Sequence, residues 1–216
     1  MLKVNGLVTI GHLGGKIFMC MNNIGYNIIL ASNSPRRKEL LAGLGVKFDV
    51  RLIADIDETY PDNIKSHDVA EYIAKKKADA YKQSIASNEL IITADTIVIL
   101  GDEIFGKPLN ADDAYAMLQK LSGKTHQVIT GVCLLTKNEQ RVFRVTTDVT
   151  FKELEMEEIK YYVDNYKPFD KAGAYGIQEW IGYIGVTSLN GSYFNVVGFP
   201  VQRIYTELQK FASRNM

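Results

Sequence analysis

Cysteine and histidine are scarce in this chain. Among 216 residues the cysteines are Cys20 and Cys133, which lie far apart, and neither belongs to a CxxC pair. The sequence therefore has no zinc or thiol-redox signature, and it favours a reducing, cytoplasmic compartment. The histidines match no metal-ligand spacing either; they are His12, His67 and His126.

Net charge is also absent, because 25 Lys and Arg residues balance 25 Asp and Glu residues. A general nucleic-acid-binding protein is usually basic overall, so this balance argues against that class. No apolar run approaches the length of a membrane-spanning helix, and neither a P-loop nor a GxSxG motif occurs. The hydrophobic content of 46% is ordinary for a globular protein with one large domain or two small lobes.

The first 26 residues differ from the rest. Glycines and charged residues interrupt their apolar positions, so no signal-peptide core forms. We expect residues 1–26 to be an extension outside the fold and residues 27–216 to be a single domain. Met19 and Met21 offer alternative start residues.

Strand and helix patterns alternate through the remaining chain. Two hairpins are predicted, one turning at 101–102 and one at 137–138, and hairpins among helices indicate an α/β fold with a mixed sheet flanked by helices. The glycine-rich and aromatic-rich segment 167–185 is assigned no element. The predicted strands are 26–32, 46–53, 90–100, 103–106, 126–136 and 140–151, and the predicted helices are 35–45, 66–87, 110–123, 155–165 and 199–212.

The stretch "ILASNSPRRKELL" predicts an anion site. Ser34 reads as a helix N-cap and Pro35 as the first helical residue, so free backbone N–H groups point at the turn. Arg36 and Arg37 oppose the helix dipole, which suggests a ligand that offsets the cost. Their planar guanidinium groups suit phosphate oxygens. The alternative is that both arginines are solvated and paired with nearby acids such as Glu39.

Asp95 lies in the middle of the apolar run "LIITADTIVIL". A carboxylate there is partly buried and needs a partner, so it is a candidate metal ligand or base. The alternative is a buried ion pair with a lysine. Thr96 adds a hydroxyl on the opposite face of the strand, or beside the ligand if the strand bends.

Three lysines and one glutamine are further candidate binding residues because of their sequence neighbours. Lys77 belongs to a run of lysines on an otherwise apolar helix, and Lys107 sits between glycine and proline on a rigid loop. The segment "FDKAGAYGIQ" pairs Asp170 with Lys171 and ends at Gln178, whose amide can read the edge of a uracil or thymine ring. Each of these side chains alone is more often solvated than functional.

Together these segments resemble the Maf family of septum-formation-protein-like nucleoside triphosphate pyrophosphatases. The matching pieces are "LASNSPRRKELL", "KKKA", "TADTIV", "GKP", "LSGKTHQVITGV", "DKAGAYGIQ" and "NGSYFNVVGFPV", in the family's order. The resemblance implies an elongated, inosine-triphosphatase-like sheet with two lobes around a cleft. It also implies hydrolysis of a nucleoside triphosphate to the monophosphate and pyrophosphate.

The resemblance further implies roles for single residues. Asp95 looks like the general base, and a divalent cation, Mg²⁺ or Mn²⁺, is expected, with Glu39, Asp57 and Glu58 as further candidate ligands. Family members are often dimers, so a homodimer is expected. Arg36, Thr96 and Gln178 look like the set that selects dTTP and UTP, including modified pyrimidine forms in a house-cleaning role, while the expected phosphate-binding residues are Ser34, Arg37, Lys77 and Lys107.

One position departs from the family pattern. After Gln178 the family often has glycine, whereas Glu179 and Trp180 follow here, so the rim of the base pocket can differ. The same reaction on another base, such as 7-methyl-GTP, therefore stays open. A second alternative, which the family's link with septum formation suggests, is a nucleotide-binding regulator of cell division without turnover. Neither nucleic acid nor a membrane is expected as a partner.

Overall fold

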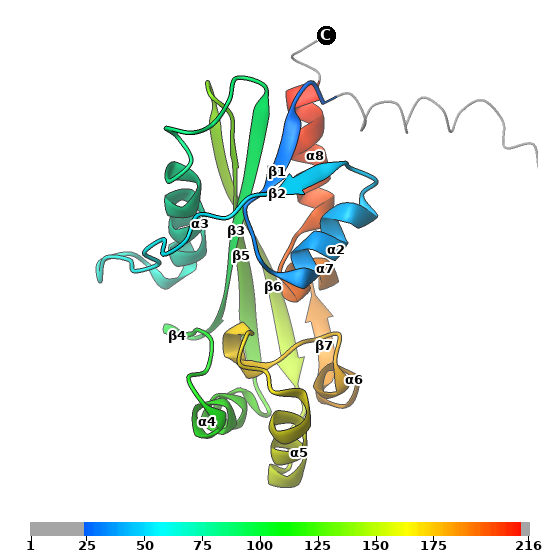
Figure 1. The fold of residues 1–216 in the computed structure, drawn as a ribbon. Coiled ribbons are helices and arrows are strands. Elements are labelled where there is room, and N and C mark those ends of the chain that lie inside the picture. The colour runs from blue at the N-terminus through cyan, green and yellow to red at the C-terminus, as the bar shows by residue number, and fades with distance from the viewer. Residues whose placement is uncertain (1–23, 213–216) are drawn as a thin grey trace, which may run out of the picture.

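The computed structural model describes residues 24–212 as an elongated molecule built along three long strands (Figure 1). The strands are β1 (Asn27–Leu30), β2 (Phe48–Val50), β3 (Glu89–Leu100), β4 (Glu103–Phe105), β5 (Thr125–Leu135), β6 (Gln140–Phe151) and β7 (Val186–Asn190). The helices are α2 (Pro35–Gly43), α3 (Val69–Asp79), α4 (Ala111–Leu121), α5 (Met156–Tyr166), α6 (Trp180–Gly185), α7 (Tyr193–Val197) and α8 (Val201–Ala212), with short 3₁₀ turns at Ser66–Asp68 and Ala172–Ala174.

Within residues 24–212, seven strands form one mixed sheet in the order β2-β1-β3-β5-β6-β7, and β4 also pairs with β3. β1 is parallel to β2 and to β3, whereas the remaining pairs are antiparallel. The predicted α/β fold with a mixed sheet is confirmed. β3, β5 and β6 are long because their apolar residues contribute to more than one core along their length.

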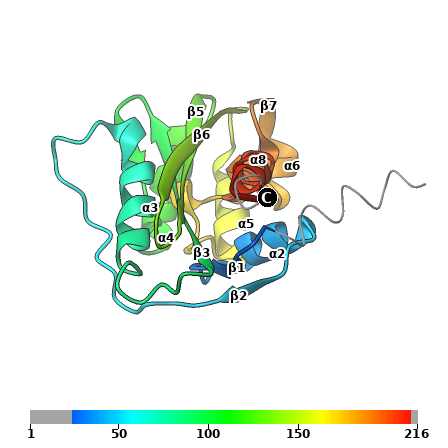
Figure 2. The same ribbon diagram turned by 90° about the horizontal axis from the view of Figure 1, so that it is seen from above.

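Helices cover both faces of the upper half of the sheet (Figure 2). α2 and α8 pack on one face around Leu30, Leu41 and Phe199, and α3 packs on the other around Ile91 and Ala74. This arrangement follows from the parallel βαβ connections, which place α2 and α3 on opposite faces of the strands that they join.

A separate apolar core fills the lower half, where α4, α5 and α6 meet the far ends of β5 and β6. Leu118, Phe151, Tyr162 and Ile181 are fully or almost fully buried in it. The two halves with their own cores are the two lobes that the sequence predicted, and the long strands connect them.

Two buried features stabilise the upper lobe. Gly131 on β5 allows α3 to approach closely, because a Cβ there would lie 2.3 Å from the backbone carbonyl of Ala70. Glu207 on α8 is only 2% exposed and bonds to three cations, which are Arg141, Arg203 and Lys210. Burial raises the pKa of Glu207, but the hydrogen bonds from these cations outweigh it and lower the pKa to about 2.

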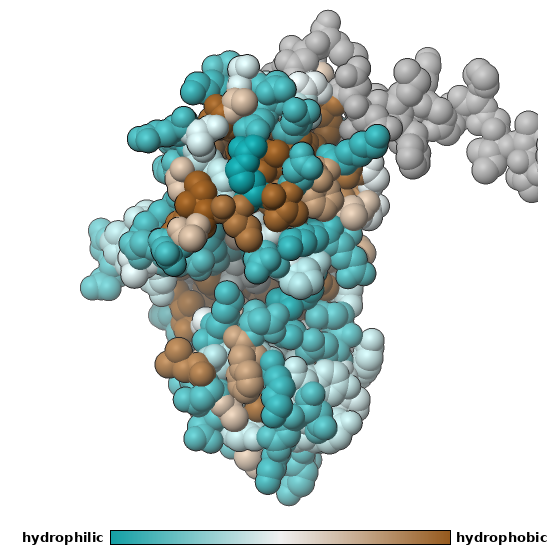
Figure 3. All heavy atoms as spheres, in the orientation of Figure 1, coloured by the Kyte–Doolittle hydropathy of each residue, from teal (hydrophilic) through white to brown (hydrophobic). Residues whose placement is uncertain are grey.

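The face shown in Figure 3 is largely hydrophilic, with apolar side chains gathered on the upper lobe near β2. Val50, Leu52 and Ile53 are exposed in this segment. No helix within residues 24–212 is long and apolar enough to cross a membrane.

Most predicted elements are present, with three differences. The helix predicted over 66–87 ends at Asp79, because Tyr81 turns into the core and its hydroxyl bonds to the backbone of Arg51 and Ile53. The segment 167–185 contains α6, and the sequence did not indicate β7 or α7.

The predicted N-terminal extension lies mostly outside the described residues. Its last members do contact the fold: Ile24 is 3% exposed in the upper core, and the ring of Tyr26 packs edge-on against Phe211 at 6.2 Å. Ile24 and Tyr26 of the predicted extension therefore pack against the upper core.

Candidate active site

The sheet has an opening along one edge of β3. β1 pairs with β3 only as far as Ile92, and β4 begins to pair with the same strand at Val98. Within the described residues, positions 93–97 have no strand partner on that edge. Because α2 and α3 leave the neighbouring strands toward opposite faces, this is the kind of position where open α/β sheets bind ligands.

A cavity of about 550 Å³ lies at this opening and reaches both lobes. Five cationic and four acidic side chains of the described chain line it, a dense mixture of charges for one cavity. It brings together nine of the predicted site residues: Ser34, Arg36, Arg37, Glu58, Lys77, Asp95, Thr96, Lys107 and Gln178.

The N-terminus of α2 faces this cavity. Ser34 is its N-cap, as predicted, and its hydroxyl accepts a hydrogen bond from the backbone N–H of Arg37 at 3.4 Å. Pro35 occupies the first turn, and the turn contains no acidic residue, so the positive end of the helix is uncompensated.

Arg37 braces the open edge of β3. Its Nε donates to the carbonyl of Gly198 at 2.9 Å, and its Nη1 donates to the carbonyl of Ala94 at 2.8 Å and to Ser32 Oγ at 3.4 Å. Its Nη2 donates to Thr96 Oγ1 at 3.1 Å. Burial lowers the pKa of the Arg37 guanidinium, an effect that the nearby carboxylate of Asp95 partly offsets.

The phosphate-binding role of Arg37 stays a prediction, and its bonds show what else this side chain does. A guanidinium has five N–H groups, and in the described part of the chain four are already donated to protein atoms. These four bonds hold the strand edge and Thr96 in place, so in this arrangement Arg37 braces the opening.

Asp95 and Lys77 form a close ion pair beside the opening. Lys77 Nζ lies 2.8 Å from Asp95 Oδ1 and 3.0 Å from Glu58 Oε1. The Asp95 and Lys77 side chains are 13% and 15% exposed, so both are largely shielded from water yet line the cavity. The ion pair with a lysine, which the sequence offered as the alternative for Asp95, is present, and the same carboxylate lines the cavity.

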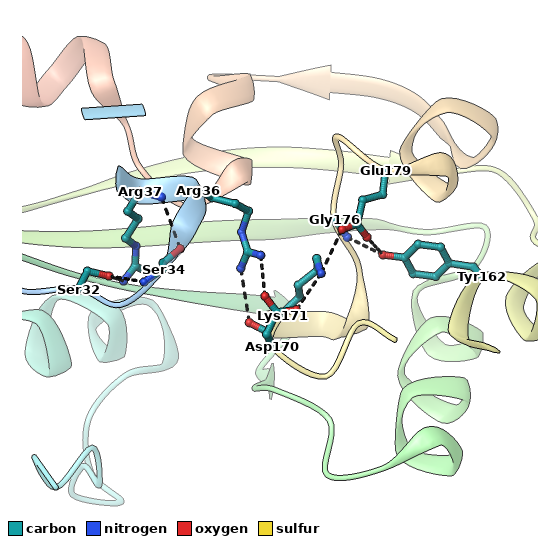
Figure 4. A network of polar contacts seen from close by, with 9 residues as sticks. All are labelled: Ser32, Ser34, Arg36, Arg37, Tyr162, Asp170, Lys171, Gly176 and Glu179. Atoms are coloured by element: carbon teal, nitrogen blue, oxygen red, sulfur yellow. Dashed lines mark hydrogen bonds and ion pairs between the residues drawn. The ribbon is translucent and has the colours of Figure 1, made fainter. Parts of the chain in front are cut away.

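Arg36 reaches across the cavity to the other lobe (Figure 4). Its Nη1 lies 2.7 Å from Asp170 Oδ2, and Asp170 Oδ1 lies 2.8 Å from Lys171 Nζ. Burial by itself raises the pKa of Asp170. The hydrogen bonds from Lys171 and Arg36 have the larger effect and lower the pKa to about 2. The acid that pairs with Arg36 is thus distant in sequence and is not the neighbouring Glu39.

Gln178 and Thr96 line the same cavity. Within the described chain, the Oε1 atom of Gln178 is buried and has no hydrogen-bond partner, so an acceptor is left for a ligand. Thr96 Oγ1 contacts Arg37 Nη2 and lies 3.0 Å from Thr130 Oγ1.

The structure does not bring the three predicted metal ligands together. Glu58 lines the cavity, but Glu39 is exposed on α2 and Asp57 is bound to Lys76 Nζ at 2.7 Å, and neither lines it. Among residues 24–212 no cluster of three or more potential metal ligands occurs. A pair, Asp95 and Glu58, shares Lys77.

Two residues near the site were not found from the sequence. Glu179 was noted only because it departs from the family pattern. Tyr162 was not noted, because an aromatic residue within a predicted helix is interpreted as part of the core. Glu179 directly follows Gln178, and the hydroxyl of Tyr162 bonds to Glu179 and to the backbone N–H of Gly176.

These features define an α/β protein whose cavity can hold a nucleotide-sized anionic ligand beside a shielded carboxylate. The family model described as Maf-like protein matches residues 27–211, and the chain belongs to this family, as the sequence motifs predicted.

Relatives and a solved structure extend the comparison. A dTTP/UTP pyrophosphatase of Phocaeicola vulgatus is 64% identical over 185 residues, covering 86% of this chain and 96% of that protein. A dTTP/UTP pyrophosphatase of Parabacteroides distasonis is 59% identical over 186 residues, with coverage of 86% and 96%. A HAM1 protein from Coxiella burnetii aligns over 86% of this chain and 99% of its own, with 14% identity and a TM-score of 0.47.

Proposed function

We propose that this protein is a pyrophosphatase that hydrolyses dTTP and UTP to the monophosphate and pyrophosphate. The observation that carries the proposal is that one cavity is lined by the carboxylate of Asp95, by lysine and arginine side chains, and by Gln178 with its buried, unpartnered acceptor. The names of relatives at 59–64% identity support the same reaction. Modified pyrimidine nucleotides are proposed as further substrates in a house-cleaning role.

The triphosphate is proposed to bind along the N-terminus of α2 and the cations around it. Lys107 is exposed at the cavity and has no ion-pair partner among the described residues, so its ammonium is free for a phosphate. Arg36 is held by Asp170, whose side chain is 57% exposed, and a phosphate of higher charge can compete for it. Ser34 lies where the helix dipole favours an anion.

The chemical step is the breaking of the phosphoanhydride bond between the α and β phosphates. Asp95 accepts a proton from a water molecule as the water oxygen bonds to phosphorus, and pyrophosphate leaves with the electrons of the broken P–O bond. Lys77, beside Asp95, and Lys107 stabilise the charge that develops on the phosphate oxygens. Because the Asp95 side chain is only 13% exposed, its carboxylate has few contacts with bulk water and is available to the attacking water molecule.

The residues present fit a divalent cation. Asp95 and Glu58 both approach the Lys77 ammonium, at 2.8 and 3.0 Å, so two carboxylates already converge on one positive charge. Mg²⁺ in proteins is commonly held by one or two carboxylates together with substrate phosphates. When bound there, Mg²⁺ or Mn²⁺ would neutralise phosphate charge.

Base recognition is proposed for Gln178, with Thr96 beside it. Uracil and thymine offer an N–H donor next to a carbonyl acceptor, and a carboxamide offers the complementary acceptor and donor. The unpartnered Oε1 of Gln178 suits the ring N–H. A cavity of about 550 Å³ suits one free nucleotide, in agreement with a small-molecule substrate.

A substrate panel tests the proposal. The protein is incubated with Mg²⁺ and dTTP, UTP, CTP, GTP or 7-methyl-GTP, and released pyrophosphate is measured. We expect release from dTTP and UTP above the other three. Preference for 7-methyl-GTP would contradict the base assignment, and binding without release from any nucleotide would favour the regulator of cell division.

The cellular setting is also proposed. The substrates belong to the nucleotide pool, which supports the cytoplasm as the location. The homodimer implied by the family resemblance stays a prediction that analytical ultracentrifugation can check.

A further inference from the structure

A tight turn carries Gln178 into the cavity. The backbone N–H of Glu179 donates to the carbonyl of Gly176 at 3.0 Å and closes the turn. Gln178 is its third residue, and its Oε1 is the buried acceptor without a partner in the described chain. Whatever fixes this turn therefore also fixes where that amide points.

Tyr162 on α5 contacts both ends of the turn (Figure 4). Its hydroxyl oxygen accepts the N–H of Gly176 at 3.0 Å, and its O–H donates to Glu179 Oε2. Tyr162 is completely buried in the lower core, so its position is set by packing. Burial, together with the adjacent Glu179, raises the pKa of Tyr162, which keeps the hydroxyl protonated as a donor.

The second carboxylate oxygen of Glu179 anchors the turn to the cavity wall. Glu179 Oε1 lies 3.0 Å from Lys171 Nζ, and Lys171 lies 2.8 Å from Asp170. Asp170 in turn holds Arg36. Charges of alternating sign thus run from the turn, across the cavity, to α2 in the other lobe.

The turn is also closely packed at Gly176. A Cβ at this position would lie 2.8 Å from Gln178 Nε2 and 3.0 Å from Glu179 Oε2. The two side chains therefore rest against the same glycine. A movement of the Glu179 carboxylate changes the space available to the neighbouring amide of Gln178.

We propose that Glu179 and Tyr162 are positioning residues that hold the Gln178 amide in one orientation, and that this selects uracil and thymine over cytosine. An amide rotated by 180° exchanges its acceptor and its donor. Cytosine presents an acceptor and an amino donor where uracil presents a donor and an acceptor, so a freely rotating amide binds both. The inference rests on the proposed function, and it adds the device that sets the base preference.

The test compares kcat/KM for UTP with kcat/KM for CTP. In Glu179→Gln the charge facing Lys171 is lost, and in Tyr162→Phe the hydroxyl that joins both ends of the turn is lost. We expect the UTP-to-CTP ratio to fall by about tenfold or more in each variant. We expect kcat for UTP to change by less than about threefold, because neither Glu179 nor Tyr162 lines the cavity.

Two comparisons separate positioning from general damage. Tyr161→Phe is a matched control, because Tyr161 is the neighbouring tyrosine on α5, is 48% exposed, and keeps its ring contact with Trp180 as phenylalanine. Its ratio should equal that of the wild type. Adding Glu179→Gln to Gln178→Ala should change the ratio no further, since Glu179 acts through Gln178.

An NMR measurement keeps this inference distinct from the proposed function. The side-chain NH₂ signals of Gln178, identified by their loss in Gln178→Ala, should form one sharp pair in the wild type and broaden or shift in Glu179→Gln. Unchanged signals or an unchanged ratio in Glu179→Gln would overturn the inference. Absence of hydrolysis in the wild type would overturn the proposed function instead, and the NMR result would still decide the role of Glu179.

Discussion

Replacing Arg37 by lysine tests whether this residue is a brace or a phosphate ligand. Lysine keeps the charge but carries its donors on one nitrogen, so it cannot reach acceptors that four separate N–H groups now serve. Hydrogen bonds from a charged donor contribute about 1.5–3 kcal/mol each, and the loss of two gives a decrease of about 3 kcal/mol or more in the free energy of unfolding.

Urea denaturation and calorimetry measure this decrease. For a domain of this size we expect Tm to fall by about 6–12 °C. Arg36→Lys is the matched control from the adjacent position, because Arg36 makes an ion pair with an exposed acid, and we expect a loss below about 1 kcal/mol. If Arg37→Lys were as stable as Arg36→Lys, the bracing role would be refuted.

Three further outcomes are expected. Gly131→Ala should lower the free energy of unfolding by about 1–3 kcal/mol in urea, because α3 must move, whereas Gly43→Ala, with nothing within 4 Å, should raise it by about 0.4–1 kcal/mol. Glu58→Ala should raise the Mg²⁺ concentration for half-maximal turnover about tenfold, and Glu39→Ala should not. The lowered pKa of Glu207 stabilises the fold, fully at pH values above the ordinary pKa of a glutamate and progressively less as the pH falls toward about 2. The difference in the free energy of unfolding between wild type and Glu207→Gln, measured in urea, should therefore shrink over this pH range. Each prediction has a contradicting result: a large loss of stability in Gly43→Ala, an unchanged Mg²⁺ dependence in Glu58→Ala, or a stability difference for Glu207→Gln that does not change with pH.

Local signals in the sequence predicted much of the fold. Ser34 followed by Pro35 marks a helix start that depends only on neighbouring residues, and the hairpin turns are equally local. α6, α7 and β7 were missed because they are short and are stabilised by packing against the lower core, whose other residues are distant in sequence. The early end of α3 depends on Tyr81 bonding to a segment 30 residues away.

The site shows the same division. Asp95 was found because a carboxylate in an apolar strand is unusual by itself. The role of Arg37 was not found, since it depends on where β1 stops pairing with β3, which one sequence does not reveal. Likewise, Asp170 as the partner of Arg36 is 134 positions away, and no local pattern points to it.

Asp95 is proposed to take the proton from the attacking water. The most direct measurement is pyrophosphate release from UTP by Asp95→Asn, with nucleotide affinity measured by calorimetry on the same protein. We expect kcat to fall by about 10²–10⁴-fold while the Kd for UTP stays within about threefold of the wild-type value. Turnover near the wild-type rate in this variant would contradict it.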